Sequence, residues 1–204
     1  MKLTAFSSIG FAVFCLLWVF LTYVFLPVME TDYSVLIRDP QWTLVTSAGL
    51  IASILGIFAL FGLYHHTRKS PVLTSGIILL ILGLMLELSG KTWDLFVWPV
   101  LCSYEQHLPF IKQGLFLESL PFMVFFILLL LFLFVGSLLT GIGFLKIKQY
   151  GKAPFLIIIG IVLYAAGNFT LFHLAAAGLC VYSVAFLMIG IKLFKDQRQP
   201  VMDK

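Results

Sequence analysis

Apolar residues form long uninterrupted runs along this chain, and polar residues gather in the short segments between them. Runs of about 20 residues match the length of an α-helix that crosses about 30 Å of hydrocarbon. The run from Phe122 to Leu133 shows no alternation of polar and apolar positions, which favours helices over the strands of a membrane barrel. We therefore predict an all-α bundle of six transmembrane helices with short cytoplasmic loops, at about residues 5–27, 43–64, 72–90, 119–145, 153–169 and 171–193.

The boundary between the last two predicted helices depends on one short polar segment. Residues 154–193 comprise 40 positions, which is too many for one span of about 17–25 residues. Gly167, Asn168 and Thr170 interrupt this run, and Gly and Asn favour a tight turn. The alternative is a five-span protein in which one long bent helix replaces these two.

The composition is typical of a membrane protein and excludes other classes. Hydrophobic residues make up 61% of the 204 residues and charged residues 11%, whereas a soluble domain is about a quarter charged. No linker or low-complexity tract divides the chain, so we expect residues 1–204 to form a single integral membrane domain. Nucleic-acid binding would need a basic patch on a water-exposed domain, and the sequence offers no such domain.

The distribution of basic residues predicts the orientation. With the N-terminus in the cytoplasm, only Arg38, Lys91 and Lys112 of the 13 Lys and Arg residues fall outside, as the positive-inside rule requires. We expect a plasma (inner) membrane protein with both termini in the cytoplasm and with anionic lipids as partners of its inner face. The residues placed inside are Lys2, Arg68, Lys69, Lys146, Lys148, Lys152, Lys192, Lys195, Arg198 and Lys204.

Small residues recur at helical spacing within several of the predicted spans. Residues of this kind let helix backbones approach closely in a membrane. Because six helices already offer one another many partners, we expect these positions to mediate contacts inside the bundle and not a dimer face. They are Ala48, Ala52 and Gly56, then Gly76, Gly83 and Gly90, and finally Ser137 and Gly141.

Three charged residues interrupt the end of the third predicted helix. Glu87 lies 16 residues after Pro71, or about 24 Å along a helix, which is about 6 Å short of the far boundary of the hydrocarbon. Lys91 follows four residues later and Asp94 three beyond that, so the three share one helix face, with Glu before Lys in the favourable order. The spacing predicts a carboxylate–ammonium–carboxylate ladder at the outer interface.

The ladder is also a candidate site, because an ionisable group inside a membrane is a functional-site hypothesis by default. If the bundle gathers further polar residues of similar depth around it, they line an outward-open cavity for a cation, a small solute or a lipid headgroup. Residues 101–118 are too polar to span, and we expect them to cap the bundle along the outer interface. The candidate site residues are Glu87, Lys91, Asp94, Glu105, His107, Asn168 and His173.

No catalytic motif such as G-x-S-x-G or H-E-x-x-H occurs, and the three cysteines show no CxxC spacing. No catalytic residue, metal or cofactor is therefore implied by motif. We predict a protein that binds or passes a small solute or lipid, alone or with a membrane protein partner as part of a larger complex. Two alternatives remain open: an intramembrane enzyme or redox or metal protein that uses Glu87 and the outer-side histidines, and a structural accessory subunit.

Overall fold

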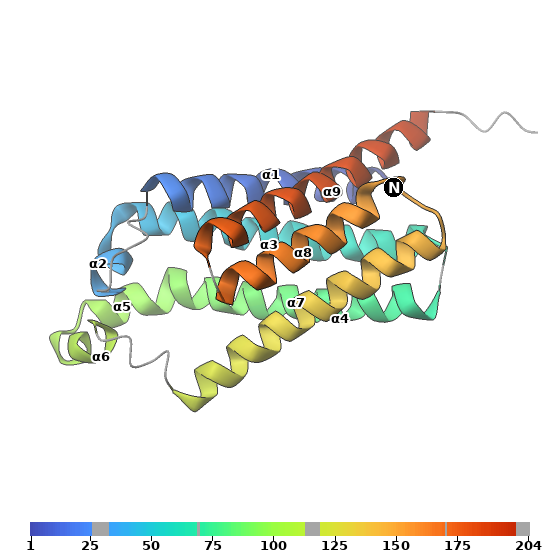
Figure 1. Cartoon of the computed structure of the whole chain (residues 1–204). Helices are drawn as coiled ribbons and strands as arrows, with labels where there is room; N and C mark the ends of the chain where they lie inside the picture. The colour runs from blue at the N-terminus through green and yellow to red at the C-terminus, as the bar shows by residue number, and fades with distance from the viewer. Residues whose placement is uncertain (26–32, 69, 113–118, 170, 199–204) are drawn as a thin grey trace, which may run out of the picture.

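The computed structural model describes residues 1–25, 33–68, 70–112, 119–169 and 171–198, and these form helices with no strand among them. Six helices are long, and short helical pieces lie between them (Figure 1). The long helices are α1 (Lys2–Phe25), α3 (Pro40–His66), α4 (Pro71–Thr92), α7 (Leu120–Lys146), α8 (Ala153–Phe169) and α9 (Phe172–Arg198). The short pieces are α2 (Tyr33–Arg38), the π-helical turn η1 (Trp93–Val97), α5 (Trp98–Cys102), the 3-10 turn η2 (Glu105–His107) and α6 (Leu108–Lys112).

Five of these helices are long and apolar enough to cross a membrane, which indicates a membrane protein. They are α1, α3, α4 with its continuation to Cys102, α7 and α9. The sixth long helix, α8, is equally apolar in character but has only 17 residues. That length is the lower limit for a span.

Helix starts follow ordinary capping chemistry. Ser70 accepts a hydrogen bond from the backbone N–H of Leu73 at 3.2 Å, and Pro71 opens α4, where its missing N–H costs nothing. Asp39 caps α3 in the same way: its side chain accepts a hydrogen bond from the backbone N–H of Gln41, and Pro40 is the first residue of the helix. These local signals explain why the helices begin where they do.

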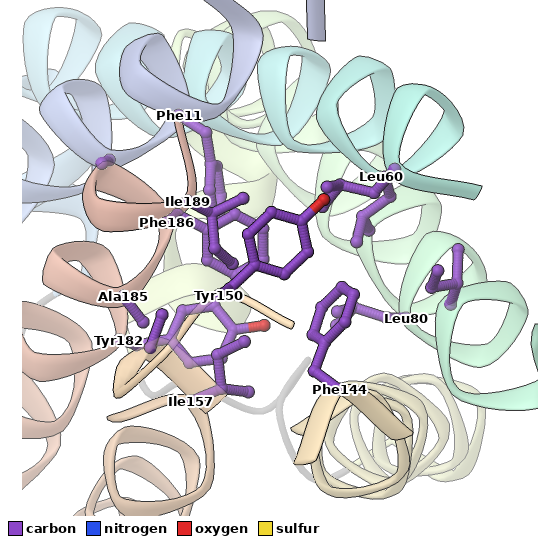
Figure 2. Packing of buried hydrophobic residues seen from close by; sticks show 14 of the residues in the cluster. Phe11, Leu60, Leu80, Phe144, Tyr150, Ile157, Tyr182, Ala185, Phe186 and Ile189 are labelled. Atoms are coloured by element: carbon purple, nitrogen blue, oxygen red, sulfur yellow. The ribbon is translucent and has the colours of Figure 1, made fainter. Parts of the chain in front are cut away.

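The long helices form a closed ring in chain order. α1 packs on α3, α3 on α4, α4 on α7, α7 on α8, α8 on α9, and α9 returns to α1. Aromatic side chains pack inside this ring, where the Phe11 and Phe186 rings meet edge to face at 4.8 Å (Figure 2). In this ring the 17-residue α8 packs against two neighbours, α7 and α9, as each of the other long helices does.

One end of the bundle, which we call the basic end, holds the start of α1, the α3–α4 and α7–α8 connections and the last turn of α9 (Figure 1). The α-amino group of Met1 lies 3.0 Å from Nε2 of His66, so the first residue contacts the end of α3. The opposite end, the cap end, carries α2, α5, α6 and the α8–α9 turn. Both described chain ends therefore lie at the same end of the bundle.

Close glycine contacts hold the ring together, as the spacing of small residues predicts. A Cβ on Gly76 would come within 2.5 Å of the Thr140 nitrogen, and one on Gly83 within 2.8 Å of Leu133. Gly136 meets the backbone of Leu80 from the other side, so α4 and α7 touch through their backbones. The expectation of close contacts inside the bundle is confirmed at Gly76 and Gly83, but not at Gly90, where the atom nearest to an added Cβ, in the Phe125 ring, is 3.8 Å away. Ala48, Ala52, Gly56, Ser137 and Gly141 are likewise turned into the bundle.

The break near residue 170 separates two helices. α8 ends at Phe169 and α9 begins at Phe172, and the two lie against each other through Gly160 and Gly178, whose backbones are in contact. One long bent helix is therefore not formed. Thr170, one of the residues used to predict the break, lies outside the described residues.

The third predicted helix was expected to end near residue 90, and this boundary is wrong. The helix continues beyond Thr92 through η1 and α5 to Cys102. The π-helical turn ends at Val97, two residues before Pro99. Because Pro99 has no N–H to offer the preceding turn, the wider turn accommodates the proline without ending the helix. The expected cap at residues 101–118 is present in part as η2 and α6, while residues 113–118 lie outside the described part of the chain.

Candidate functional site: a charged ladder between two cavities

The predicted ladder forms on α4 and its continuation. Nζ of Lys91 lies 3.5 Å from Oε1 of Glu87 and 3.7 Å from Oδ2 of Asp94. The three side chains keep 17% to 27% of their accessible surface, so solvent or lipid still reaches each of them. The contacts are local to one helix, which is why sequence spacing was enough to predict them.

Two neighbouring helices hold Lys91 in place. Its ammonium group lies 4.7 Å from the centre of the Trp18 ring of α1, within the range of a cation–π interaction. On α3, Gly49 provides the room for the Lys91 stem, since a Cβ there would lie 3.2 Å from Cε of Lys91. Trp18 lies inside α1 and not at its end, where tryptophan is usually found in membrane helices, and this contact accounts for its position.

A cavity of about 60 Å³ lies at the centre of the ring, and we call it the central cavity. Each of the six long helices contributes to its wall. Most of the lining is apolar or aromatic, and Glu87 is the charged residue among the described side chains that line it. Tyr164 and Cys15 line the same cavity as Glu87.

Hydroxyl groups provide the remaining polarity of the central cavity. The Tyr182 hydroxyl and Ser137 Oγ are 2.9 Å apart and hydrogen-bond each other, joining α9 to α7. Ser53 Oγ donates to the Gly49 carbonyl of its own helix at 3.1 Å. The hydrogen-bonding needs of these three hydroxyls are met within the protein. Glu87 is then the side chain in this lining that could bind a ligand through its charge.

An apolar groove of about 350 Å³ between α7 and α8, the lateral groove, adjoins the central cavity. The two share Leu133, Ile161 and Tyr164, so these side chains form the wall between them. The groove lies along this pair of helices, whose ribbons run in similar directions in Figure 1. In a membrane, such a groove faces the hydrocarbon chains of lipids.

Asn168 and His173 lie near a third space, of about 100 Å³, between α1, α8 and α9. Asn168 lines it and donates to the Tyr164 carbonyl at 2.8 Å, while Nδ1 of His173 lies 2.6 Å from the Tyr23 hydroxyl. Trp18, Tyr164 and Leu179 line both this space and the central cavity, so they separate the two. These two predicted site residues therefore stand at the cap-end approach to the central cavity, away from the ladder.

Glu105 and His107 are not brought to the ladder. Both belong to η2, where Glu105 is exposed and His107 contacts Gln106 and the Tyr104 ring. Neither lines the cavities described above. The expected single polar cavity that gathers all seven residues is thus not what the helices build.

A fourth space, of about 380 Å³, lies between η1 and the start of α7, and we call it the interfacial cavity. Asp94 lines it together with Trp93, Trp98, Phe122 and Phe125. Glu87 lines the central cavity and Asp94 the interfacial cavity, with Lys91 between them. The ladder therefore joins two separate spaces.

Sequence reasoning missed several lining residues, chiefly Trp18, Tyr164 and Tyr182. A signal was available, because a tyrosine or tryptophan in the middle of an apolar run needs a partner for its polar atom. Within the described part of the chain, no three His, Cys, Asp or Glu side chains gather in a way that could hold a metal ion, and the three cysteines are not disulfide-bonded.

No protein-family model, curated protein or solved structure matches this chain.

Proposed function

We propose that this protein crosses the plasma membrane six times and binds a small lipid-soluble molecule in its central cavity, for storage, sensing or passage. The observation that carries the proposal is the carboxylate of Glu87, which lies at a cavity to which all six long helices contribute. Placing a carboxylate in hydrocarbon costs about 2.5–3.5 kcal/mol on insertion scales, so a membrane protein retains one where it has a partner or a function.

The sizes of the spaces suggest how the ligand is held. About 60 Å³ is too small for a whole drug-sized ligand, whose pockets usually exceed about 300 Å³. The adjoining lateral groove is about 350 Å³ and apolar. A ligand with a polar head and an apolar tail would place its head near Glu87 and its tail in the groove, so access is from the lipid between α7 and α8.

The orientation is part of the proposal. The basic end carries most of the Lys and Arg residues that the structure describes, so we place it in the cytoplasm against anionic lipid headgroups. The cap end then faces the outside. In this orientation Glu87 lies in the outer half of the membrane.

Quenching of Trp18 fluorescence tests ligand binding, because Trp18 lines the central cavity. The protein that retains Trp18 as its single tryptophan (Trp42, Trp93 and Trp98 changed to Phe) is placed in lipid nanodiscs and titrated with a chain-brominated fatty alcohol. We expect saturable quenching. Leu133→Phe should weaken the apparent affinity about tenfold, because the larger side chain occupies the space where the groove adjoins the cavity.

The matched control is Ile142→Phe, a substitution of the same kind on α7 at a residue that is 38% exposed and lines neither the groove nor the central cavity. It should leave the titration unchanged. Quenching that rises linearly with the quencher and is equal in all three proteins would show that the alcohol only dissolves in the lipid, and the proposal would be wrong.

A further inference from the structure

The second cavity on the ladder has a chemistry of its own. Four aromatic rings and one carboxylate line the interfacial cavity: Trp93, Trp98, Phe122, Phe125 and Asp94. The Trp93 and Trp98 rings come from one helical segment, with centres 6.1 Å apart, and the two phenylalanines come from the first turns of α7. Aromatic faces around a carboxylate are the usual means of binding a methylated ammonium group.

The ladder leaves this cavity with negative charge. Lys91 is the cation that the described residues bring within 4 Å of Glu87 and Asp94, and it serves both. One ammonium between two carboxylates leaves a net charge of about −1 when all three are ionised. A cation that enters the interfacial cavity meets this charge at Asp94.

The cavity exists because α4 and α7 separate toward the cap end. Three glycines of α4 record the separation: a Cβ would lie 2.5 Å from the nearest atom of α7 at Gly76, 2.8 Å at Gly83 and 3.8 Å at Gly90. The helices are in backbone contact at the first two positions and apart at the third. Gly90 lines the interfacial cavity, so the widening space is where the cavity lies.

The depth of the cavity matches the headgroup region. Asp94 lies 23 residues after Pro71, or about 34 Å along a straight helix, whereas the hydrocarbon is about 30 Å thick. Trp93 is 53% exposed beside it, as expected for an aromatic residue at the membrane interface. A ligand held here would keep its charged group at the surface and its chain in the hydrocarbon.

We propose that the interfacial cavity binds a methylated ammonium group, with Asp94 as its counter-ion and the rings of Trp93, Trp98 and Phe125 as its walls. The shared chemistry is that of a choline lipid headgroup and of a small quaternary ammonium solute. The site is separate from the central cavity, so this proposal stands or falls independently of the function proposed above.

Native mass spectrometry of the full chain, released from detergent, measures lipid binding directly. Phosphatidylcholine and phosphatidylglycerol of the same chains are added in separate titrations. We expect phosphatidylcholine to bind at least about tenfold more tightly, and Asp94→Asn and Gly90→Leu each to remove that preference, the first by removing the charge and the second by filling the space.

Two controls separate the site from general effects. Asp196→Asn removes an exposed carboxylate at the basic end, and Leu133→Phe alters the central cavity; both should keep the preference. Gly90→Leu adds its side chain where the nearest atom is 3.8 Å away, so it should fold, and the thermal unfolding midpoint of each variant verifies this.

A further arm adds tetramethylammonium chloride to distinguish the source of the ammonium group. Its displacement of phosphatidylcholine supports a site for the ammonium group in either form. Binding of tetramethylammonium that is lost in Asp94→Asn, without any preference for phosphatidylcholine, supports a site for the free solute. Equal binding of both lipids with no effect of tetramethylammonium, or a preference that survives both Asp94→Asn and Gly90→Leu, would overturn the proposal.

Discussion

Lys91 is the residue that connects the charged side chains of the ladder to the neighbouring helices. It contacts two carboxylates of its own helical segment, and the Trp18 ring of α1 and the space left by Gly49 of α3 fix its side chain. Removing an ammonium that two carboxylates share leaves both without a partner at the edge of the hydrocarbon. The loss is greater than for a surface ion pair, because the alternative solvent is lipid.

We predict that Lys91→Met lowers the free energy of unfolding by about 2–3 kcal/mol, somewhat less than the 3–5 kcal/mol for a fully buried pair because the three side chains keep some exposure. Thermal unfolding in detergent measures this. Lys195→Met, at an exposed position near the end of α9, is the control and should change stability by less than about 0.5 kcal/mol. Equal midpoints for Lys91→Met and the unmodified protein would mean that the ladder contributes nothing to the fold.

Tyr150 gives a second prediction at this scale, outside the membrane-spanning helices. Burial of its hydroxyl, with a smaller contribution from the charge of Asp196, raises the pKa of Tyr150 to about 12 from its ordinary value near 10. Its ring contacts Phe144 edge to face at 5.0 Å, and Figure 2 shows the ring reaching toward Leu60. The folded protein therefore favours the neutral phenol.

Because the folded pKa is the higher one, the folded state holds the proton more tightly than the unfolded state between pH 10 and about 12. The stability that this provides is fully present below pH 10 and is lost as the pH rises through about 12. We predict that Tyr150→Phe, which keeps the ring, shows a shallower loss of stability over this range. Parallel pH profiles of the unfolding midpoint for the two proteins would contradict the assignment.

Among the elements, α4 and α7 are in close contact at the glycines near the basic end and lie apart near the cap end. Backbones meet at Gly76 and Gly83, and the helices part at Gly90. A side chain added at a backbone contact must push the helices apart, whereas one added in open space need not.

We predict that Gly76→Ala destabilises the protein by about 1–3 kcal/mol and that Gly90→Ala changes stability by less than about 0.5 kcal/mol. The two substitutions are identical and lie on the same face of the same helix, so helix propensity cancels in the comparison. Unfolding midpoints in one detergent measure both. A larger effect at Gly90 than at Gly76 would contradict the packing of this pair.

Local features of the sequence predicted the elements well, and relations between elements less well. The positions of the long helices follow from apolar runs and caps, and the ladder follows from spacing within one helix. The extension through Pro99 was missed because a π-helical turn absorbs the proline, which the pattern does not signal. The separation of Glu105 and His107 from the ladder depends on how η2 packs, which no local pattern encodes.

A tyrosine or tryptophan in the middle of an apolar run signals that its polar atom needs a partner, but which of these residues line one cavity could not be predicted, for a similar reason. It depends on the order of helices around the ring and on the rotation of each helix about its axis. Tyr164 and Tyr182 reach the cavity from two different helices, and only their packing brings them near Glu87. A single sequence carries no direct information on that rotation.

At the scale of the whole molecule, the ring determines where the chain ends lie. The start of α1 and the end of α9 both lie at the basic end, and the proposed six crossings, an even number, would return the chain to the side from which it started. The apolar exterior and the charges at that end are the physical basis for the proposed orientation.

We predict that protein tags fused before Met1 and after Lys204 are both protected from protease in intact cells and both cleaved in inverted membrane vesicles. The reason is that the basic end resists translocation. A tag inserted at Glu105, at the cap end, should show the reverse pattern and is the control. Protection of one terminal tag and cleavage of the other would rule out six crossings.

Photolabelling detects directly whether the cavity inside this membrane bundle takes up lipid-soluble molecules. A fatty alcohol with a diazirine on its chain is photolysed with the full chain in nanodiscs, and the labelled residues are mapped by mass spectrometry. We predict labels concentrated at Leu133, Ile161 and Tyr164, reduced by excess unlabelled alcohol. Labels spread evenly over exposed lipid-facing residues such as Phe58 and Ile78, without competition, would contradict the account.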